Sequence, residues 1–241
     1  MEHLDSGRII YYVREYFFPA GCSICGSNLI TAEEAWYGLC TVCRSGIEAE
    51  IDAERANERC DRCGKPLISE QGRCLSCRKR EDFIVDSITV LFPYMGKYRK
   101  LLAGYKFGKS LACGHYLAEK MRDALAVACA SGACIVPVPP RPGKIRKMGW
   151  DQVEYLARLL EKGGLPVNRC LKRLPSQSQK ELGRDNRMTN LQGRIIPVRQ
   201  VPQTCVLIDD VMTTGSTLEA CASALKNGGA QTVSGLCLFY D

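Results

Sequence analysis

Four Cys-x-x-Cys pairs in the first eighty residues constrain the fold of this chain more than any other feature. They read CSIC, CTVC, CDRC and CLSC, and 14, 16 and 10 residues separate successive pairs. Two residues between cysteines let a tight turn present both sulfurs to one tetrahedral ion, and two such turns complete a four-cysteine zinc site. A glycine follows both the first and the third pair, as a sharp backbone turn tends to require. The pattern predicts two structural zinc ions.

The expected zinc ligands are Cys22, Cys25, Cys40, Cys43, Cys60, Cys63, Cys74 and Cys77. The simplest arrangement joins neighbouring pairs along the chain, although the spacing leaves a cross-braced pairing open. Redox activity is the main competing explanation for such pairs, but four copies in eighty residues argue against it. Because this segment is small and polar, zinc binding is expected to supply its folding free energy. The other seven of the 15 cysteines stand singly, and we interpret them as small core residues.

The chain lacks the sequence features of a secreted or membrane-spanning protein. Its first 19 residues carry charges throughout instead of the uninterrupted apolar stretch of a signal peptide. Nowhere does an apolar run approach the roughly 18 residues that a membrane span needs. We therefore expect a cytoplasmic protein with reduced thiols and no membrane insertion.

The distribution of charge predicts a polyanionic partner. The net charge is +7, and residues 97–200 hold 21 basic against 7 acidic residues. Residues 1–80 are nearly balanced, with 11 basic and 12 acidic residues. Several basic runs in one stretch favour either phosphate-rich small molecules or nucleic acid.

Beyond residue 80, strand-like and helical patterns alternate. Strands are expected near residues 83–94, 133–140, 203–209 and 232–239, and helices near 110–130, 150–164 and 216–230. This alternation is typical of an α/β domain with a mostly parallel sheet, whose ligands gather at the carboxyl ends of the strands. We predict two domains, a double zinc-ribbon module with an N-terminal helix over 1–80 and an α/β domain over 81–241.

The stretch VLIDDVMTTGST places two aspartates at the end of an expected strand, before a turn of small hydroxyl residues. The backbone N–H groups of this turn face the start of a helix and form a ready anion site. Gly215 lets the backbone approach a phosphate, and the two carboxylates are suited to accept from adjacent ribose hydroxyls, directly or through magnesium. A plain strand, turn and helix is the competing interpretation. The candidate binding residues are Asp209, Asp210, Thr213, Thr214, Gly215, Ser216 and Thr217.

This stretch is similar to the phosphoribosyl-pyrophosphate (PRPP) loop of type I phosphoribosyltransferases. A four-pair zinc module followed by such a domain resembles the ComF/GntX family over nearly the whole chain. Further motifs of the family match GYKFGK at 104–109, PVPP before a basic loop, and the set Gln179, Leu182, Arg187 and Asn190. One motif departs from the family, because MGWDQ stands where Arg-Gly-Phe-Asn-Gln is usual. Met148 replaces an arginine and Asp151 replaces an asparagine, which leaves less positive charge to bind diphosphate. Arg146 and Lys147 are candidates to replace the lost charge.

The resemblance implies a role in DNA uptake during natural transformation, with single-stranded DNA handled in the cytoplasm beside a competence helicase and the uptake machinery. It also implies binding of PRPP or a nucleotide with magnesium. The aromatic residues Tyr105 and Trp150 lie in or beside basic runs and are candidates for stacking on bases, or for the core. The expected nucleic-acid-binding residues are Lys106, Lys109, Arg141, Arg146, Lys147 and Arg187.

Three functions compete at this point. The first is an accessory protein that binds DNA and a phosphoribosyl ligand, and the second is a phosphoribosyltransferase acting on a nitrogenous base. The third is a zinc-ribbon interaction protein whose second half is only a scaffold. The intact acid pair and hydroxyl turn argue against the third, and the lack of an identifiable base-recognising segment favours the first over the second.

Overall fold

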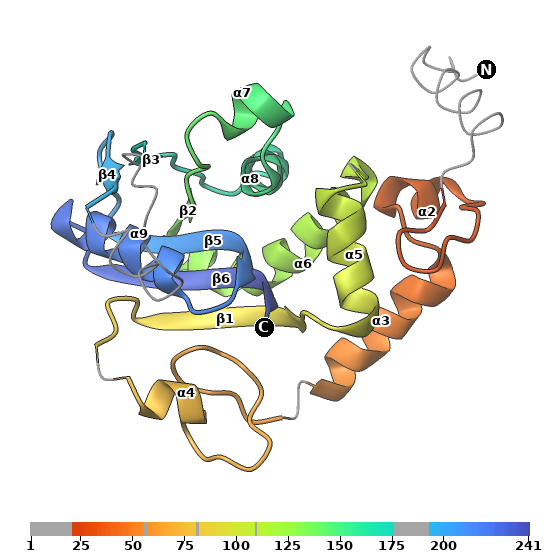
Figure 1. Ribbon diagram of the computed structural model, residues 1–241, viewed down its shortest axis with the longest axis horizontal. Coiled ribbons are helices and arrows are strands. Elements are labelled where there is room, and N and C mark those ends of the chain that lie inside the picture. Colours follow the sequence, from red (N-terminus) through yellow and green to blue (C-terminus); the bar gives the residue numbers. More distant parts are fainter. Residues whose placement is uncertain (1–20, 55–56, 81, 109, 176–192) are drawn as a thin grey trace, which may run out of the picture. The chain divides into compact units, whose positions relative to one another are not determined.

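The computed structural model describes residues 21–54, 57–80, 82–108, 110–175 and 193–241 (Figure 1). These residues form two compact units: those up to 54 join Gly96–Tyr116, and those from 57 to Met95 join Leu117–Asp241. Each unit combines residues from both sides of the domain boundary that the sequence predicts near residue 80. The division of the chain into a zinc-ribbon module and an α/β domain at that boundary stays a prediction. The expected N-terminal helix lies outside the described residues. In the part that is described, no helix has the length and apolar content to cross a membrane.

The first unit surrounds the first two cysteine pairs with helices. They are α2 (Ala32–Tyr37), α3 (Thr41–Glu54), α5 (Gly96–Lys106) and the first turns of α6 (Leu111–Ala130). Its fully buried side chains are Leu39, Ile47, Leu101, Tyr105, Cys113 and Tyr116. Since Tyr105 is fully buried, its interpretation as a ring that stacks on a base is wrong, and its alternative role in the core is confirmed.

The second unit is built on a four-stranded sheet with the order β1-β6-β5-β2. The strands are β1 (Ser87–Pro93), β6 (Thr232–Tyr240), β5 (Thr204–Met212) and β2 (Cys134–Pro137). All three pairings are parallel, as the alternating pattern predicts. Tyr240 lies opposite both Pro93 and Met212, so the carboxyl ends of three strands share one edge of the sheet.

Helices and a small pair of antiparallel strands complete this unit. The helices are α4 (Leu75–Arg78), most of α6, α7 (Lys144–Met148), α8 (Gln152–Lys162) and α9 (Ser216–Asn227). The helices expected near 110–130, 150–164 and 216–230 are confirmed. The antiparallel pair β3 (Leu171–Arg173) and β4 (Ile195–Pro197) was not predicted, because three-residue strands leave no readable period in the sequence.

The third and fourth cysteine pairs pack directly on the sheet of this unit. Ile88 N–H in the edge strand β1 donates to the Arg62 carbonyl at 3.0 Å, and Arg59 Nη1 donates to the Val90 carbonyl at 3.0 Å. These bonds satisfy backbone groups that an edge strand would otherwise expose. Cys60 belongs to the same buried cluster as Ile88 and Val90. The second cysteine group is therefore part of the core around the sheet.

The glycines after the first and third cysteine pairs have the left-handed backbone that the sharp turns were expected to need. Gly26 has φ +79° with open space around a built Cβ, whereas Gly64 has φ +69° and its Cβ would lie 2.4 Å from the Ile88 carbonyl oxygen. We expect Gly26→Ala to cost about 1 kcal/mol from backbone strain alone. Gly64→Ala is expected to cost about 3 kcal/mol or more, since overpacking adds to the same strain. Urea unfolding of the two variants checks this difference, and equal losses would contradict the packing of this turn on β1.

The single cysteines are mostly core residues, as expected. Cys113, Cys170, Cys205, Cys221 and Cys237 have no exposed surface. Burial raises the pKa of the Cys205 thiol to about 12, so it stays protonated at neutral pH. Two further cysteines, at positions 129 and 134, are only half-buried.

Candidate functional site

The eight paired cysteines form two four-cysteine groups, each with its sulfurs within 4.8 Å of one another. The groups join Cys22, Cys25, Cys40 and Cys43 in the first unit, and Cys60, Cys63, Cys74 and Cys77 in the second. Pairing of neighbours along the chain is therefore confirmed over the cross-braced alternative. One sulfur pair in each group lies 3.7 Å apart. Zinc bound to four thiolates at about 2.3 Å places its sulfurs about 3.8 Å apart, so both groups fit structural zinc.

Backbone N–H groups prepare the second cysteine group for metal binding. Burial opposes ionisation of Cys60, but N–H groups of Cys63, Cys74 and Arg62 donate to its sulfur and lower the pKa of the thiol to about 6. The Cys74 nitrogen lies 3.4 Å from the Cys60 sulfur. Because the thiolate is the form that binds zinc, these N–H groups favour metal binding through Cys60, whereas burial raises the pKa of Cys63 in the same group to about 11.

The acid pair lies at the carboxyl end of β5, as the sequence predicts. Asp209 and Asp210 are half-buried, and the Asp210 N–H donates to Asp209 Oδ1 at 2.8 Å. Cys237 is buried in the neighbouring strand β6, and its burial is the main cause that raises the pKa of its thiol. The negative charges of Asp209 and Asp210 raise this pKa further. The two acids therefore lie at the strand-end edge where α/β domains bind their ligands.

The turn after β5 has the geometry of an anion-binding loop. Gly215 takes φ +75° and precedes α9, and nothing lies within 4 Å of a Cβ built on it. Thr213 and Thr214 are exposed, and Thr214 Oγ1 lies 2.7 Å from Ser216 Oγ. In the part of the chain that the structure describes, the N–H groups of Thr214, Gly215 and Thr217 donate to no protein acceptor. All five residues of the expected loop thus form one short turn, in which these three N–H groups are open and that of Ser216 donates to Thr214 Oγ1 at 3.4 Å.

Three arginines line a cavity of about 350 Å³ that the sequence did not indicate as a site. Arg141 follows β2, Arg173 ends β3 and Arg194 precedes β4. Burial lowers the pKa of Arg173, the neighbouring charges of Arg141 and Arg194 lower it further, and Asp209 opposes them. The cluster therefore lies within electrostatic range of the acid pair. Of the three, only Arg141 is predicted from the sequence, because the other two lie in or beside the antiparallel strands β3 and β4, which the sequence does not predict.

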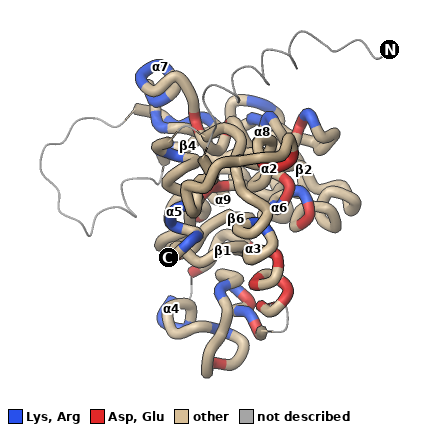
Figure 2. The backbone as a smooth tube through the Cα atoms, turned by 90° about the vertical axis from the view of Figure 1, so that its right-hand side faces the viewer, with Lys and Arg blue, Asp and Glu red and all other residues tan. Residues whose placement is uncertain are grey.

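The expected nucleic-acid-binding residues fall in different parts of the molecule. Arg141, Arg146 and Lys147 are exposed in the second unit, and the last two lie on α7, along which Figure 2 shows Lys and Arg gathered. Lys106 ends α5 in the first unit. Lys109 and Arg187 lie outside the described residues, as do Gln179, Leu182 and Asn190. A positive groove formed by residues 97–147 stays a prediction.

The MGWDQ departure from the family motif has a structural explanation. Asp151 is 4% exposed, caps α8 by accepting the Glu154 N–H at 3.0 Å, and pairs with Lys144 Nζ at 2.6 Å. An N-cap carboxylate satisfies an unpaired helix donor and favours the helix dipole. Trp150 is half-buried and packs edge-to-face with Tyr155 at 6.3 Å between ring centroids. Met148 is exposed at the end of α7.

Comparison with known families agrees with this architecture. The double zinc ribbon domain matches residues 13–79, and the phosphoribosyl transferase domain matches residues 202–241, which contain the acid pair and the hydroxyl turn. Competence protein F of Haemophilus influenzae is 28% identical over 235 residues, which cover 90% of this chain and 95% of that protein.

Two further relatives also match along most of their length. Competence protein ComFC of Streptococcus pneumoniae is 24% identical and covers 88% of this chain and 96% of its own. DNA utilization protein YhgH of Salmonella typhimurium is 25% identical, with 91% and 96% covered.

A double zinc ribbon followed by a type I phosphoribosyltransferase-like α/β domain defines the class of protein to which this chain belongs. Within that class, the chain is similar along most of its length to two competence proteins and a DNA utilization protein, in agreement with the resemblance of its sequence motifs.

Proposed function

We propose that this protein binds single-stranded DNA and a phosphoribosyl ligand, PRPP with magnesium or a nucleotide, and acts as an accessory protein of DNA uptake in the cytoplasm. The main support for a phosphoribosyl ligand is the turn at Thr213–Thr217, which has open N–H donors and follows two carboxylates at the end of a strand. A phosphate fits the donors, and vicinal ribose hydroxyls or magnesium fit the carboxylates. The arginine cluster adds positive charge within reach of the same edge, as a diphosphate requires.

The names of the relatives support the process. Two of them are competence proteins and one is a DNA utilization protein, so DNA handling is the shared theme. The exposed cations of α7 and the basic surplus of residues 97–200 suit a phosphate backbone. A competence helicase and the uptake machinery are the protein partners that this role implies.

A phosphoribosyltransferase reaction is the second candidate. The intact acid pair and loop favour it, since loss of diphosphate from PRPP needs charge stabilisation at the same atoms. An assay of diphosphate release from magnesium-PRPP, with and without nitrogenous bases, separates the two candidates. Release at a rate above the spontaneous one makes the protein an enzyme, and its absence alongside binding supports the accessory role.

Substitutions in the loop test the ligand site. We expect Asp210→Ala to remove a ribose or magnesium acceptor and Thr214→Ala to remove a phosphate donor. Each change should weaken magnesium-PRPP binding tenfold or more, about 1.4 kcal/mol, as measured by isothermal titration. Asp123→Ala on α6 removes an exposed carboxylate remote in sequence from the loop and serves as control, with affinity expected within twofold of wild type. Full affinity in both loop variants would exclude this turn as the site.

The salt dependence of DNA binding tests the role of α7. Replacing Arg146 and Lys147 together with alanine should reduce the slope of log K against log salt by about 1 to 1.4, because each single-strand phosphate contact contributes roughly 0.7. Replacing Arg158 and Lys162 removes the same charge from two exposed positions of another helix, α8, and is the matched control. Fluorescence anisotropy of a labelled oligonucleotide provides the measurement. Equal slopes in both double variants would move the DNA site away from α7.

A further inference from the structure

A second cavity, of about 300 Å³, lies where the second cysteine group meets the loop after β5. Both walls belong to the same compact unit. The residues of the cysteine segment that line it include Lys65, Ser76 and Arg80, and those of the loop are Thr213, Thr214 and Gly215. We call the cysteine segment, residues 57–80, the second ribbon. The cavity therefore joins a zinc site to the loop proposed above as the phosphate site.

The polar groups of this cavity select an anion. Two cationic side chains and three hydroxyl groups line it, together with one carboxylate, that of Glu219, and three cysteines of the second zinc site. Lys65 also donates to the carbonyl oxygen of Asp241. Glu219 is 6% exposed and its charge is already partnered. It accepts the N–H groups of Ile84 and Val85 at 2.8 and 3.3 Å, and Arg80 lies 3.4 Å away. The hydroxyl groups and the guanidinium of Arg80 are therefore the groups with which a ligand phosphate would make favourable contacts here.

The aromatic ring at the cavity is already occupied by cations. The guanidinium groups of Arg80 and Arg62 lie 4.9 and 5.2 Å from the centre of the Phe83 ring. Such cation–π contacts take the ring face on which a nucleobase would otherwise stack. Recognition in this cavity is therefore by charge and hydroxyl groups, which suits the phosphate of a phosphoribosyl compound better than its base.

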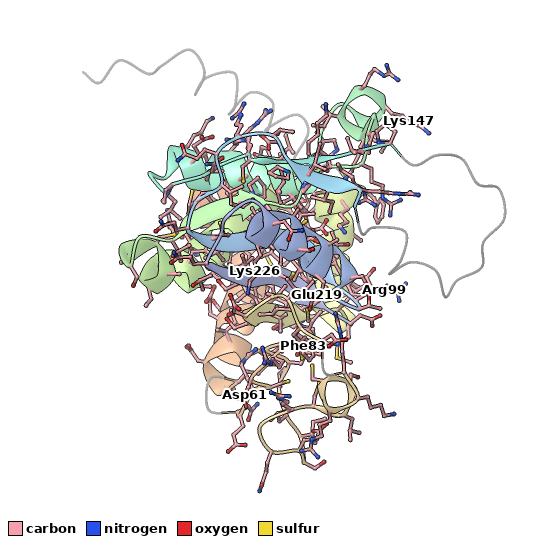
Figure 3. The ribbon with its side chains drawn as sticks, turned by 90° about the vertical axis from the view of Figure 1, so that its left-hand side faces the viewer. Asp61, Phe83, Arg99, Lys147, Glu219 and Lys226 are labelled. Atoms are coloured by element: carbon pink, nitrogen blue, oxygen red, sulfur yellow. The ribbon has the colours of Figure 1, made fainter. Side chains whose placement is uncertain are left out.

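Two connections couple the second ribbon to the loop. Ser76 lies between two zinc-binding cysteines, and Arg80 follows the last of them by three residues, so zinc fixes the backbone that carries both. On the other side, Glu219 stands in the first turn of α9, directly after the loop, and holds the segment that leaves the ribbon. Figure 3 shows Glu219 and Phe83 close together, with Asp61 of the second ribbon on the far side of Phe83.

We propose that the second ribbon is a wall of the phosphoribosyl-binding site, with Arg80 contacting the ligand phosphate and zinc at the second cysteine group holding that wall against the loop. This inference rests on the proposed function, since it assigns further residues to the same ligand. It makes the second zinc a requirement for ligand binding as well as for folding. A competing explanation is that Arg80 only balances the charge of zinc and four thiolates, which is formally negative.

Isothermal titration with magnesium-PRPP and with ribose 5-phosphate separates these explanations. Arg80→Gln is expected to weaken both ligands about tenfold while the protein keeps two zinc ions by elemental analysis. The matched control is Lys79→Gln, which removes the neighbouring charge from an exposed side chain that does not line the cavity and should bind within twofold of wild type. Equal affinities in the two variants, or a loss of zinc from Arg80→Gln with full ligand affinity, overturn the proposal. If the wild-type protein binds neither ligand, the result contradicts the proposed function itself, and the role of Arg80 falls with it.

The zinc requirement has its own test in Cys74→Ser, at the half-buried ligand of the second group. We expect zinc content to fall by about one ion and ribose 5-phosphate affinity to fall at least tenfold. Normal affinity after loss of that zinc contradicts the proposal. If this variant does not fold, the comparison of Arg80→Gln with Lys79→Gln tests the proposal by itself. Both of these variants keep all zinc ligands.

Discussion

Cys60→Ser is expected to unfold the sheet of the second unit, although the sequence assigns this residue to the zinc-ribbon module over 1–80. Cys60 is 3% exposed and shares a buried cluster with Ile88 and Val90 of β1. Structural zinc contributes about 10–16 kcal/mol of binding free energy, which equals or exceeds the roughly 5–15 kcal/mol net stability of a typical domain. Hydrogen exchange followed by mass spectrometry should show loss of protection in β5 and β6, and zinc content should fall by about one ion.

Cys22→Ser is the matched control, because this cysteine occupies the same place in the first group and is also 3% exposed. It should lose one zinc ion and the protection of residues 21–54. Protection of β5 and β6 should persist in this variant, since their buried cluster contains no cysteine of the first group. Retained protection of β5 in Cys60→Ser would contradict the account of the second ribbon as part of the core around the sheet.

Arg173→Ala is expected to weaken magnesium-PRPP binding about a hundredfold, or about 2.7 kcal/mol, without destabilising the free protein. The half-buried guanidinium lines one cavity with Arg141 and Arg194, and burial together with those charges lowers its pKa. An anion relieves this repulsion, so the arginine contributes to the bound state more than to the free one. Removing it should leave the midpoint of urea unfolding equal or higher.

Lys172→Ala provides the comparison for Arg173, because it is the neighbouring residue of β3 and is exposed. It should change neither affinity nor stability appreciably. A marked loss of stability in Arg173→Ala with unchanged ligand affinity would mean that the arginine cluster is structural.

The features that the sequence predicted are those encoded in short stretches. Cysteine spacing defines a zinc turn within four residues, and the stretch from Asp209 to Thr217 contains strand end, acids, hydroxyls and helix start together. The structure agrees with both patterns, as it does with the parallel sheet. The motif departure at Asp151 is visible in the sequence, but its cause is not. The N-cap at Asp151 and its ion pair with Lys144 depend on how α7 and α8 are placed.

The features that the sequence did not predict depend on residues far apart in the chain. The bond from Ile84 N–H to Glu219 joins residues 135 positions apart, and the antiparallel strands β3 and β4, in or beside which Arg173 and Arg194 lie, have three residues each. Neither leaves a periodic signal. The two groups of cysteines are alike in sequence, yet only Gly64 of the corresponding glycines is crowded by a neighbouring strand.

Titration of the wild-type protein with PRPP, in the presence and absence of magnesium, tests the central claim most directly. The claim is that the acid pair and the hydroxyl turn form a phosphoribosyl site. It predicts saturable binding of one ligand per chain below millimolar concentration, with weaker binding when magnesium is removed, because the carboxylates of Asp209 and Asp210 then face the ligand without a cation. Absence of binding at millimolar PRPP with magnesium, in protein that holds two zinc ions, would contradict it and leave the α/β domain as a scaffold.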